Sequence, residues 1–257
     1  MAALRSLAFL GASVLALGKA NGVETINYTV KLEKVGECLT DINTARDAVG
    51  FISFVQVGVD EEGKSLPDAV ASTAETNFKT SAWKPVCDSL LGKSSTDAPG
   101  ASASTPAKFP SGTYAFKALE SNSPTCSDIV GEWKAAYKNF KGLPPPNKDT
   151  KLYDDRNNVS FVAVYNPSPD ATADCRVVTC IKETTNTELQ PQTKNTEAGY
   201  ALICMTTPDV LPQNSTAPFT DEQWAKITKA LGGSASAAVP GLLGFATALF
   251  GLALSLF

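Results

Sequence analysis

The sequence predicts an α+β domain, arranged as a three-layer α/β/α sandwich around a central, mostly antiparallel sheet. Two β-branched valines lie between Cys175 and Cys180, which is typical of a strand. Successive side chains alternate between the faces of a strand, so these two cysteines should point to opposite faces. Strand-like runs that follow helical ones favour an antiparallel sheet, and disulfides on both faces favour helices on both sides.

The first 20 residues have the pattern of a secretory signal peptide. Arg5 precedes an apolar run from Leu7 to Leu17, and small residues follow at Gly18 and Ala20. The alternative is a buried N-terminal helix, since the run is too short to cross a bilayer.

Residues 232–257 have the pattern of a GPI attachment signal, in which small residues precede an uncharged apolar tail. No charged residue occurs from Val239 to Phe257. The candidate attachment residues are Gly232, Gly233 and Ser234. A C-terminal transmembrane helix is the alternative. With a signal peptide, a GPI signal predicts a protein held on the outer leaflet of the plasma membrane.

Residues 21–231 are enough for one well-cored domain, and this region contains every cysteine. They are Cys38, Cys87, Cys126, Cys175, Cys180 and Cys204. An even number in a secreted chain predicts three disulfides. Zinc is disfavoured, because the sequence has no Cys-x-x-Cys pair and no histidine.

The formal charge of the whole chain is -4. Removal of Arg5 and Lys19 with the signal leaves 20 basic against 26 acidic residues, a charge of -6. An acidic domain without a basic run is not suited to nucleic acid or anionic lipid.

The N-terminal half begins with an alternating run over 26–32, which predicts a strand, and a helical period over 38–50. Residues 52–57 are apolar and fit either element. Residues 70–90 predict one or two helices, with Cys87 on the inner side and a restart at Pro85.

A Ser/Thr/Ala/Pro-rich stretch from Lys93 to Pro110 predicts a long surface loop. After this loop, the alternation of Tyr114 and Phe116 with smaller or polar residues predicts a short strand. An amphipathic helix is expected from Cys126 to Phe140.

The C-terminal half contains a strand-like run at Phe161–Tyr165 and a returning strand at 200–205. The polar segment Lys182–Ala198 is predicted to be a loop. A last helix opens at Phe219–Trp224, where Thr220 and Gln223 match a capping box and the two aromatic residues match a hydrophobic staple.

Catalytic chemistry finds little support in the sequence. The absence of histidine excludes Ser-His-Asp and Cys-His arrangements. The densest acids are Asp60, Glu61 and Glu62, and Asp154 with Asp155. Adjacent acids in turns are usually solvated, although carboxylate catalysis and a weak calcium site are alternatives. No phosphate loop or dinucleotide fingerprint is present, so no cofactor is expected.

Trp83, Trp133 and Trp224 lie at helical apolar spacing, which predicts core packing. Tyr165 is expected to be a packed strand residue, with a groove lining as the alternative. Glycosylation sequons begin at Asn27, Asn158 and Asn214. Asn27 falls in a predicted strand, which makes it less accessible.

The chain resembles the SAG surface antigens of Eimeria, a GPI-anchored family of apicomplexan parasites. The resemblance is carried by 162–169, 171–180, 199–208, the Phe219–Trp224 helix and the alanine-rich tail. It implies a divergent CAP-like fold, and Asn43-x-x-Arg46-x-x-x-Gly50 is similar to a CAP pattern. Many CAP proteins hold a metal with a histidine pair, and that site cannot be transferred to a chain without histidine.

The resemblance also implies a disulfide pairing, which the spacing alone leaves open among fifteen connectivities. The implied pairs are Cys175–Cys204, Cys87–Cys180 and Cys38–Cys126.

The implied function is that of a non-catalytic surface antigen for host-cell attachment or modulation of host immunity. Its partners would be a host cell-surface molecule or immune receptor and the membrane, through the GPI lipid. The loops predicted at Lys93–Pro110 and Lys182–Ala198 are the candidate contact surfaces. The alternative is a lipid- or sterol-binding CAP-like module, and a secreted hydrolase is disfavoured by the missing histidine.

Overall fold

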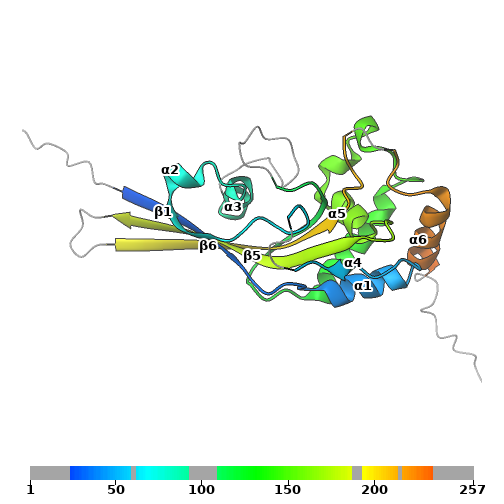
Figure 1. Ribbon diagram of the computed structural model, residues 1–257, viewed down its shortest axis with the longest axis horizontal. Coiled ribbons are helices and arrows are strands. Elements are labelled where there is room, and N and C mark those ends of the chain that lie inside the picture. Colours follow the sequence, from blue (N-terminus) through cyan, green and yellow to red (C-terminus); the bar gives the residue numbers. More distant parts are fainter. Residues whose placement is uncertain (1–23, 59–61, 93–108, 187–192, 214–215, 234–257) are drawn as a thin grey trace, which may run out of the picture.

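The computed structural model describes residues 24–58, 62–92, 109–186, 193–213 and 216–233, which form an α+β domain around a mostly antiparallel sheet (Figure 1). The strands are β1 (Glu24–Leu32), β2 (Val55–Gln56), β3 (Val70–Ala74), β4 (Thr113–Leu119), β5 (Thr172–Asn186) and β6 (Thr193–Thr207). Their order is β3-β1-β5-β6-β4, and β2 pairs with the first residues of β5 in the one parallel contact described.

Helices cover both faces of this sheet. They are α1 (Leu39–Asp47), α2 (Glu75–Phe78), α3 (Lys84–Leu90), α4 (Cys126–Ala135), α5 (Arg156–Val164) and α6 (Asp221–Gly233). Three 3-10 turns occur at Ala136–Asn139, Asn147–Asp149 and Leu152–Asp154. In Figure 1, α2 and α3 lie above the sheet, whereas α1, α4 and α5 gather at the end near α6.

β5 is buried on both faces, as the alternation argument predicts. Cys175 and Val177 belong to the core cluster beneath α1, α4 and α5. Val178 and Cys180 belong to the second cluster, which includes Trp83 of the α3 region. The prediction that Cys175 and Cys180 face opposite ways is therefore confirmed.

Each of the three disulfides connects β5 or a helix to a distant part of the chain. The pairs are Cys38–Cys126, Cys87–Cys180 and Cys175–Cys204, the same pairs that the family resemblance implies. The first joins the start of α1 to the start of α4. The second ties α3 to β5, and the third links β5 to β6 inside the sheet.

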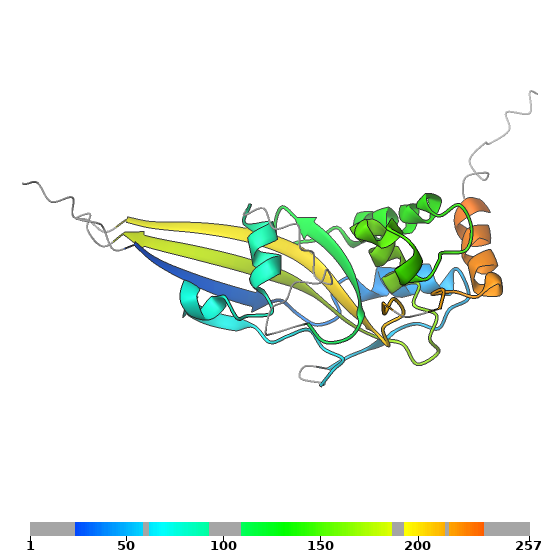
Figure 2. The ribbon, with the colours of Figure 1, turned by 90° about the horizontal axis from the view of Figure 1, so that it is seen from above.

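The domain is elongated, with a different kind of structure at each end. Figures 1 and 2 show β1, β5 and β6 extending together at one end, beyond α2 and α3 (Figure 2). At the opposite end lie α6 and the end of the described chain. A 15-residue strand such as β5 spans about 50 Å at about 3.3 Å per residue, so the two ends are far apart.

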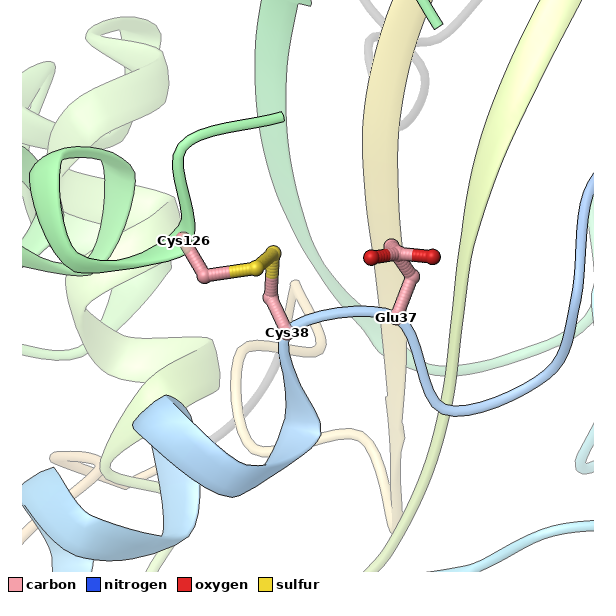
Figure 3. Close-up of side chains that lie close together, drawn as sticks. All are labelled: Glu37, Cys38 and Cys126. Carbon is pink, nitrogen blue, oxygen red and sulfur yellow. A yellow bond between two sulfur atoms is a disulfide. The ribbon is translucent and has the colours of Figure 1, made fainter. Parts of the chain in front are cut away.

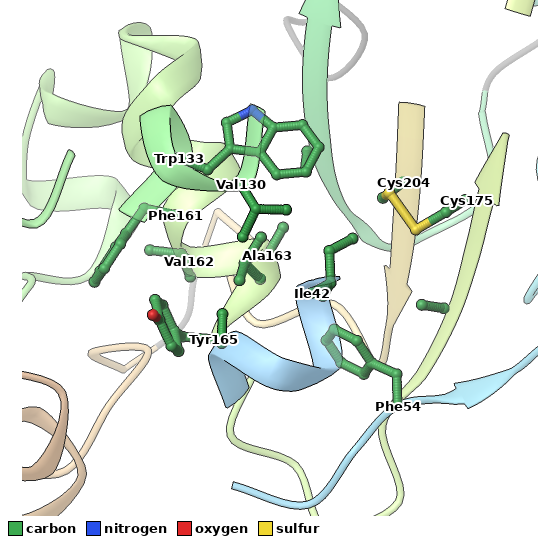
Figure 4. Close-up of a cluster of buried hydrophobic side chains, with 14 of the residues drawn as sticks. Ile42, Phe54, Val130, Trp133, Phe161, Val162, Ala163, Tyr165, Cys175 and Cys204 are labelled. Atoms are coloured by element: carbon green, nitrogen blue, oxygen red, sulfur yellow. A yellow bond between two sulfur atoms is a disulfide. The ribbon is translucent and has the colours of Figure 1, made fainter. Parts of the chain in front are cut away.

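The strand predicted at Phe161–Tyr165 is wrong, because these residues form the second half of α5 and its C-cap. Asp155 starts the helix by accepting a hydrogen bond from Asn157 N (2.8 Å). The helix packs against α4 and β4, and all five residues of the run are at most 1% exposed. Figure 4 shows Phe161, Val162, Ala163 and Tyr165 of this run in the same buried cluster as Ile42 and Val130 (Figure 4). A run whose residues are all buried has no polar face, so its helical period could not be recognised from the sequence.

The loop predicted at Lys182–Ala198 is also wrong over most of its length, because β5 continues to Asn186 and β6 begins at Thr193. Threonine favours extended backbone, and cross-strand pairs support the extension. Within 70–90, Val70–Ala74 is a strand instead of a helix. The two helices that follow, with a restart at Pro85 and Cys87 buried, confirm the rest of that prediction.

The alternating first strand and the helices predicted over 38–50 and from Cys126 to Phe140 are confirmed, the last of them continuing as the 3-10 turn at Ala136–Asn139. Most of the loop predicted at Lys93–Pro110 lies outside the described residues. Trp83 and Trp133 are fully buried, while Trp224 is partly buried against the core. The capping box of α6 is reciprocal: Gln223 N donates to Thr220 Oγ1 (3.2 Å), and Thr220 N donates to Gln223 Oε1 (2.9 Å). Phe219 and Trp224 stack with ring centroids 6.2 Å apart.

The Asn43, Arg46 and Gly50 pattern fastens the end of α1 to the segment that follows it. Asn43 Oδ1 accepts from Phe54 N (2.8 Å) and Asn43 Nδ2 donates to Phe54 O (3.3 Å). Gly50 has φ +76°, a conformation that glycine adopts at low cost, and it lets the chain turn back. The pattern is therefore structural.

Arg46 is a buried cation that holds three segments together through backbone carbonyls. It is 1% exposed, and its Nε donates to Ile52 O (2.9 Å). Its Nη1 donates to Val164 O (2.9 Å) and Asn166 O (2.8 Å) at the end of α5. The guanidinium carbon lies 3.6 Å from the centroid of the Phe54 ring. Burial lowers the pKa of Arg46 to about 10, so it remains charged at neutral pH.

Replacing Arg46 with alanine should destabilise the domain, because three backbone carbonyls, two of them in buried hydrogen bonds, lose their charged donor. We expect a loss of about 3 kcal/mol or more in the free energy of unfolding, measured by urea denaturation. Arg46→Lys keeps the charge but cannot reach all three acceptors, so its loss in the free energy of unfolding should be smaller than that of R46A. Lys229→Ala, on the exposed side of α6, is the control; equal stability of R46A and K229A would contradict the assignment.

The disulfides should stabilise their own helices locally. Because a seven-residue helix is marginal alone, C87A/C180A should increase amide hydrogen exchange in α3 and leave α1 and α4 protected. C38A/C126A serves as the matched control: it should increase amide exchange in α1 and α4 and leave α3 protected. A uniform increase across the domain in both variants would show that the bonds act only globally.

Candidate contact surface at the extended end of the sheet

The most distinctive exposed feature is the narrow end of the sheet, which we call the extended ribbon. It comprises residues 24–29 of β1, 181–186 of β5 and 193–198 of β6. β4 pairs with β6 only up to Tyr200, so it does not accompany the ribbon. The ribbon contains most of the segment Lys182–Ala198, one of the two predicted contact surfaces. Most of the other, residues 93–108, lies outside the described residues.

Two ion pairs hold β5 and β6 together in the ribbon. Lys182 is directly opposite Glu197, and Lys182 Nζ lies 2.8 Å from Glu197 Oε1. Lys194 Nζ lies 2.8 Å from Glu183 Oε1 across a diagonal. Because the four charges cancel, the ribbon surface is polar without a strong net field at this hairpin.

The two faces of the ribbon differ in their cover. On β1, Tyr28 and Val30 are buried in the cluster that contains residues of α2 and α3. The alternate residues Thr25, Asn27 and Thr29 point to the other face, where they are exposed or half-buried. The helices of that side, α1, α4 and α5, lie toward the opposite end of the sheet. Among the residues that the structure describes, no helix therefore covers this part of the sheet face, which we call the open face.

Neighbouring strands continue the open face in register. Asn27 is opposite Glu183 of β5, and Glu183 is opposite Thr196 of β6. Thr25, Thr185 and Lys194 form the next row toward the tip. Hydroxyl, amide and ion-paired groups thus dominate this surface, which suits hydrogen bonding to a polar partner better than burial of an apolar one.

A second cluster, Glu37 with Cys38 and Cys126, has the spacing of metal ligands but not their chemistry (Figure 3). It is the one grouping in the described part of the chain whose donor atoms all lie within 4.8 Å of one another. Both sulfurs are used in a disulfide, so neither can be a thiolate ligand. Glu37 instead lies 3.5 Å from Lys34 Nζ.

The acids considered for catalysis are not brought into a buried site. Asp155 caps α5, and Asp154 is exposed. Glu62 is exposed as well, while Asp60 and Glu61 lie outside the described residues. Tyr165 is completely buried in the core, so its predicted packing role is confirmed, although it follows the end of helix α5 instead of lying in a strand.

The candidate attachment residues Gly232 and Gly233 are the last two residues of α6, at the opposite end from the ribbon. Ser234, the apolar tail that follows it and the residues predicted to form a signal peptide lie outside the described residues. In the ranges that the structure describes, no helix has the length and hydrophobicity needed to cross a membrane.

The ribbon was missed from sequence because its composition resembles that of a loop. The signal that could have found it is its threonine content, together with Lys182 and Glu197 at matching distances from the hairpin centre. The asparagines of the three sequons differ in solvent exposure. Asn27 is half-exposed on the ribbon, Asn158 is buried in α5, and Asn214 lies outside the described residues.

Comparisons with known proteins agree on one family. Residues 34–246 match the family model described as the sporozoite surface antigen (SAG) protein domain. The chain is 31% identical over 209 residues to the sporulated oocyst TA4 antigen of Eimeria tenella, covering 76% of this chain and 74% of that protein. No solved structure matches the chain.

Reversing the charge of Lys182 should weaken the pairing of β5 with β6 in the ribbon. Lys182→Glu places two carboxylates opposite each other and should lose about 0.5–1 kcal/mol of stability, with faster amide exchange in β5 and β6 near the tip. The double variant K182E/E197K restores opposite charges and should recover most of the loss. If the double variant is as unstable as the single one, the ion pair does not support the ribbon.

Proposed function

Because the chain belongs to the sporozoite surface antigen family, we propose that it is a non-catalytic surface antigen, held by a GPI lipid and contacting host molecules through the extended ribbon. The partner would be a host cell-surface molecule or an immune receptor. The observation that carries the proposal is that α6, which precedes the predicted lipid attachment residues, and the ribbon lie at opposite ends of the domain.

The anchor determines which part of the domain can reach a host. Attachment at Gly232, Gly233 or Ser234 would place the lipid at the C-terminal end of α6. The ribbon would then stand on the side away from the membrane, because β5 and β6 run the length of the sheet. Many copies on one membrane gain avidity from individually weak contacts, so no deep pocket is required.

We also propose that the fold is a divergent three-layer, CAP-like sandwich. Helices on both sides of β5 support it, as does the use of Asn43, Arg46 and Gly50 to lock the first helix. The absence of histidine removes the metal chemistry associated with that fold, which is consistent with a contact role.

The anchor is tested by treating live cells with phosphatidylinositol-specific phospholipase C. Release of the protein, alongside a known anchored control, is expected. Retention while the control is released would contradict the GPI proposal and favour a transmembrane tail.

The ribbon is tested by binding of multimerised protein to host cells. Asn195→Arg places a long cation on the exposed part of β6 and should reduce binding several-fold. Ala225→Arg adds the same charge to the exposed side of α6 and should leave binding unchanged. Loss in A225R but not in N195R would move the contact surface to the other end of the domain.

A further inference from the structure

The structure gives the two described sequons opposite surroundings. Asn158 lies in α5 and is 2% exposed, whereas Asn27 lies on β1 and is half-exposed. An N-linked glycan is bulky and hydrated, so it is compatible only with an asparagine whose side chain reaches solvent in the folded protein.

At Asn158 both ends of the side-chain amide are used inside the protein. Its Nδ2 donates to Leu152 O (2.7 Å), and its Oδ1 accepts from Asn139 Nδ2 (2.7 Å). The hydroxyl of Ser160, the third residue of the sequon, donates to Arg156 O (2.7 Å) and accepts from Phe116 N (3.0 Å). A sugar on Nδ2 would disrupt this network and would have no room beside α5, which is buried on its inner side.

At Asn27 the surroundings are open. Strand alternation directs its side chain away from buried Tyr28 and Val30, onto the open face. Its neighbours in the adjacent strands are Ala74, which is small and exposed, and Glu183, which is half-exposed and paired with Lys194. Nothing in the described ranges of the chain covers this position with a helix.

We propose that Asn27 of the folded protein carries an N-linked glycan that lies over the open face of the ribbon, and that Asn158 carries none. The donor is an oligosaccharide linked through pyrophosphate to a polyprenyl lipid. Nδ2 of Asn27 attacks the anomeric carbon, a C–N bond forms, and the C–O bond to the pyrophosphate breaks. The amide nitrogen gives up one proton to a base of the transferase, and the lipid pyrophosphate leaves with the electron pair.

The glycan would lower the accessibility of lysines on the open face and leave those on the covered side unchanged. Lys31 and Lys194 share the open face with Asn27, so the sugar should shield both. Lys79 lies at the end of α2, on the covered side of the sheet, and should remain accessible. This inference does not depend on the anchor. A glycan over the open face would limit the proposed host contact to the parts of the ribbon that the sugar leaves uncovered.

Site occupancy is measured on the full-length protein isolated from the surface of cells that display it. A peptide N-glycosidase converts a glycosylated asparagine to aspartate, and digestion in ¹⁸O-labelled water followed by mass spectrometry locates each conversion. We expect label at Asn27 and none at Asn158. An unlabelled Asn27, or a labelled Asn158 in folded surface protein, would overturn the proposal; Asn214 is scored separately.

Variants check the assignment without relying on one substitution. Asn27→Gln and Thr29→Ala should each remove one mobility step on a gel, whereas Thr29→Ser keeps the sequon and should keep the step. Acetylation of Lys31 and Lys194 should be several-fold faster in N27Q than in the unaltered protein, with Lys79 unchanged. Equal acetylation of all three lysines in both proteins would show that no glycan covers this face.

Discussion

Two-sided burial of β5 is the constraint on which the rest of the domain depends. Residues 173–180 are almost inaccessible, with one set of side chains beneath α1, α4 and α5 and the other beneath α2 and α3. Even the charged members of this strand are satisfied internally: Arg176 Nε donates to Asp174 Oδ1 (2.8 Å), and Asp174 Oδ2 accepts from Leu66 N (2.8 Å). A strand buried in this way needs cover on both sides, and Cys175 and Cys180 carry a disulfide on each face.

How much of this arrangement could be predicted depends on which pattern each segment offers. The alternation around β5, the helical period of α1 and α4, and the capping box of α6 are local signals, and each predicted its element correctly. The run Phe161–Tyr165 offers no such signal. Its β-branched residues favour a strand by propensity, and only burial between α4 and β4 makes it a helix.

The candidate surface was harder to predict than the core. Polar residues without an apolar period predict a loop, but Thr184, Thr185 and Thr196 belong to strands whose stability comes from pairing with distant partners. Likewise, the pattern of Asn43, Arg46 and Gly50 was recognisable, yet its contacts with Val164 and Asn166 are more than 100 residues away in sequence. Contacts between residues so far apart in the sequence can be identified only once the fold is known.

The disulfides overlap along the chain, and this has a consequence for proteolysis. Cys38–Cys126, Cys87–Cys180 and Cys175–Cys204 together span every peptide bond from Cys38 to Cys204. A single cleavage anywhere in that interval, including residues 93–108 and 187–192, leaves both fragments covalently joined. A digestive enzyme that nicks the molecule therefore cannot shed either piece, and the cut would become visible only after reduction.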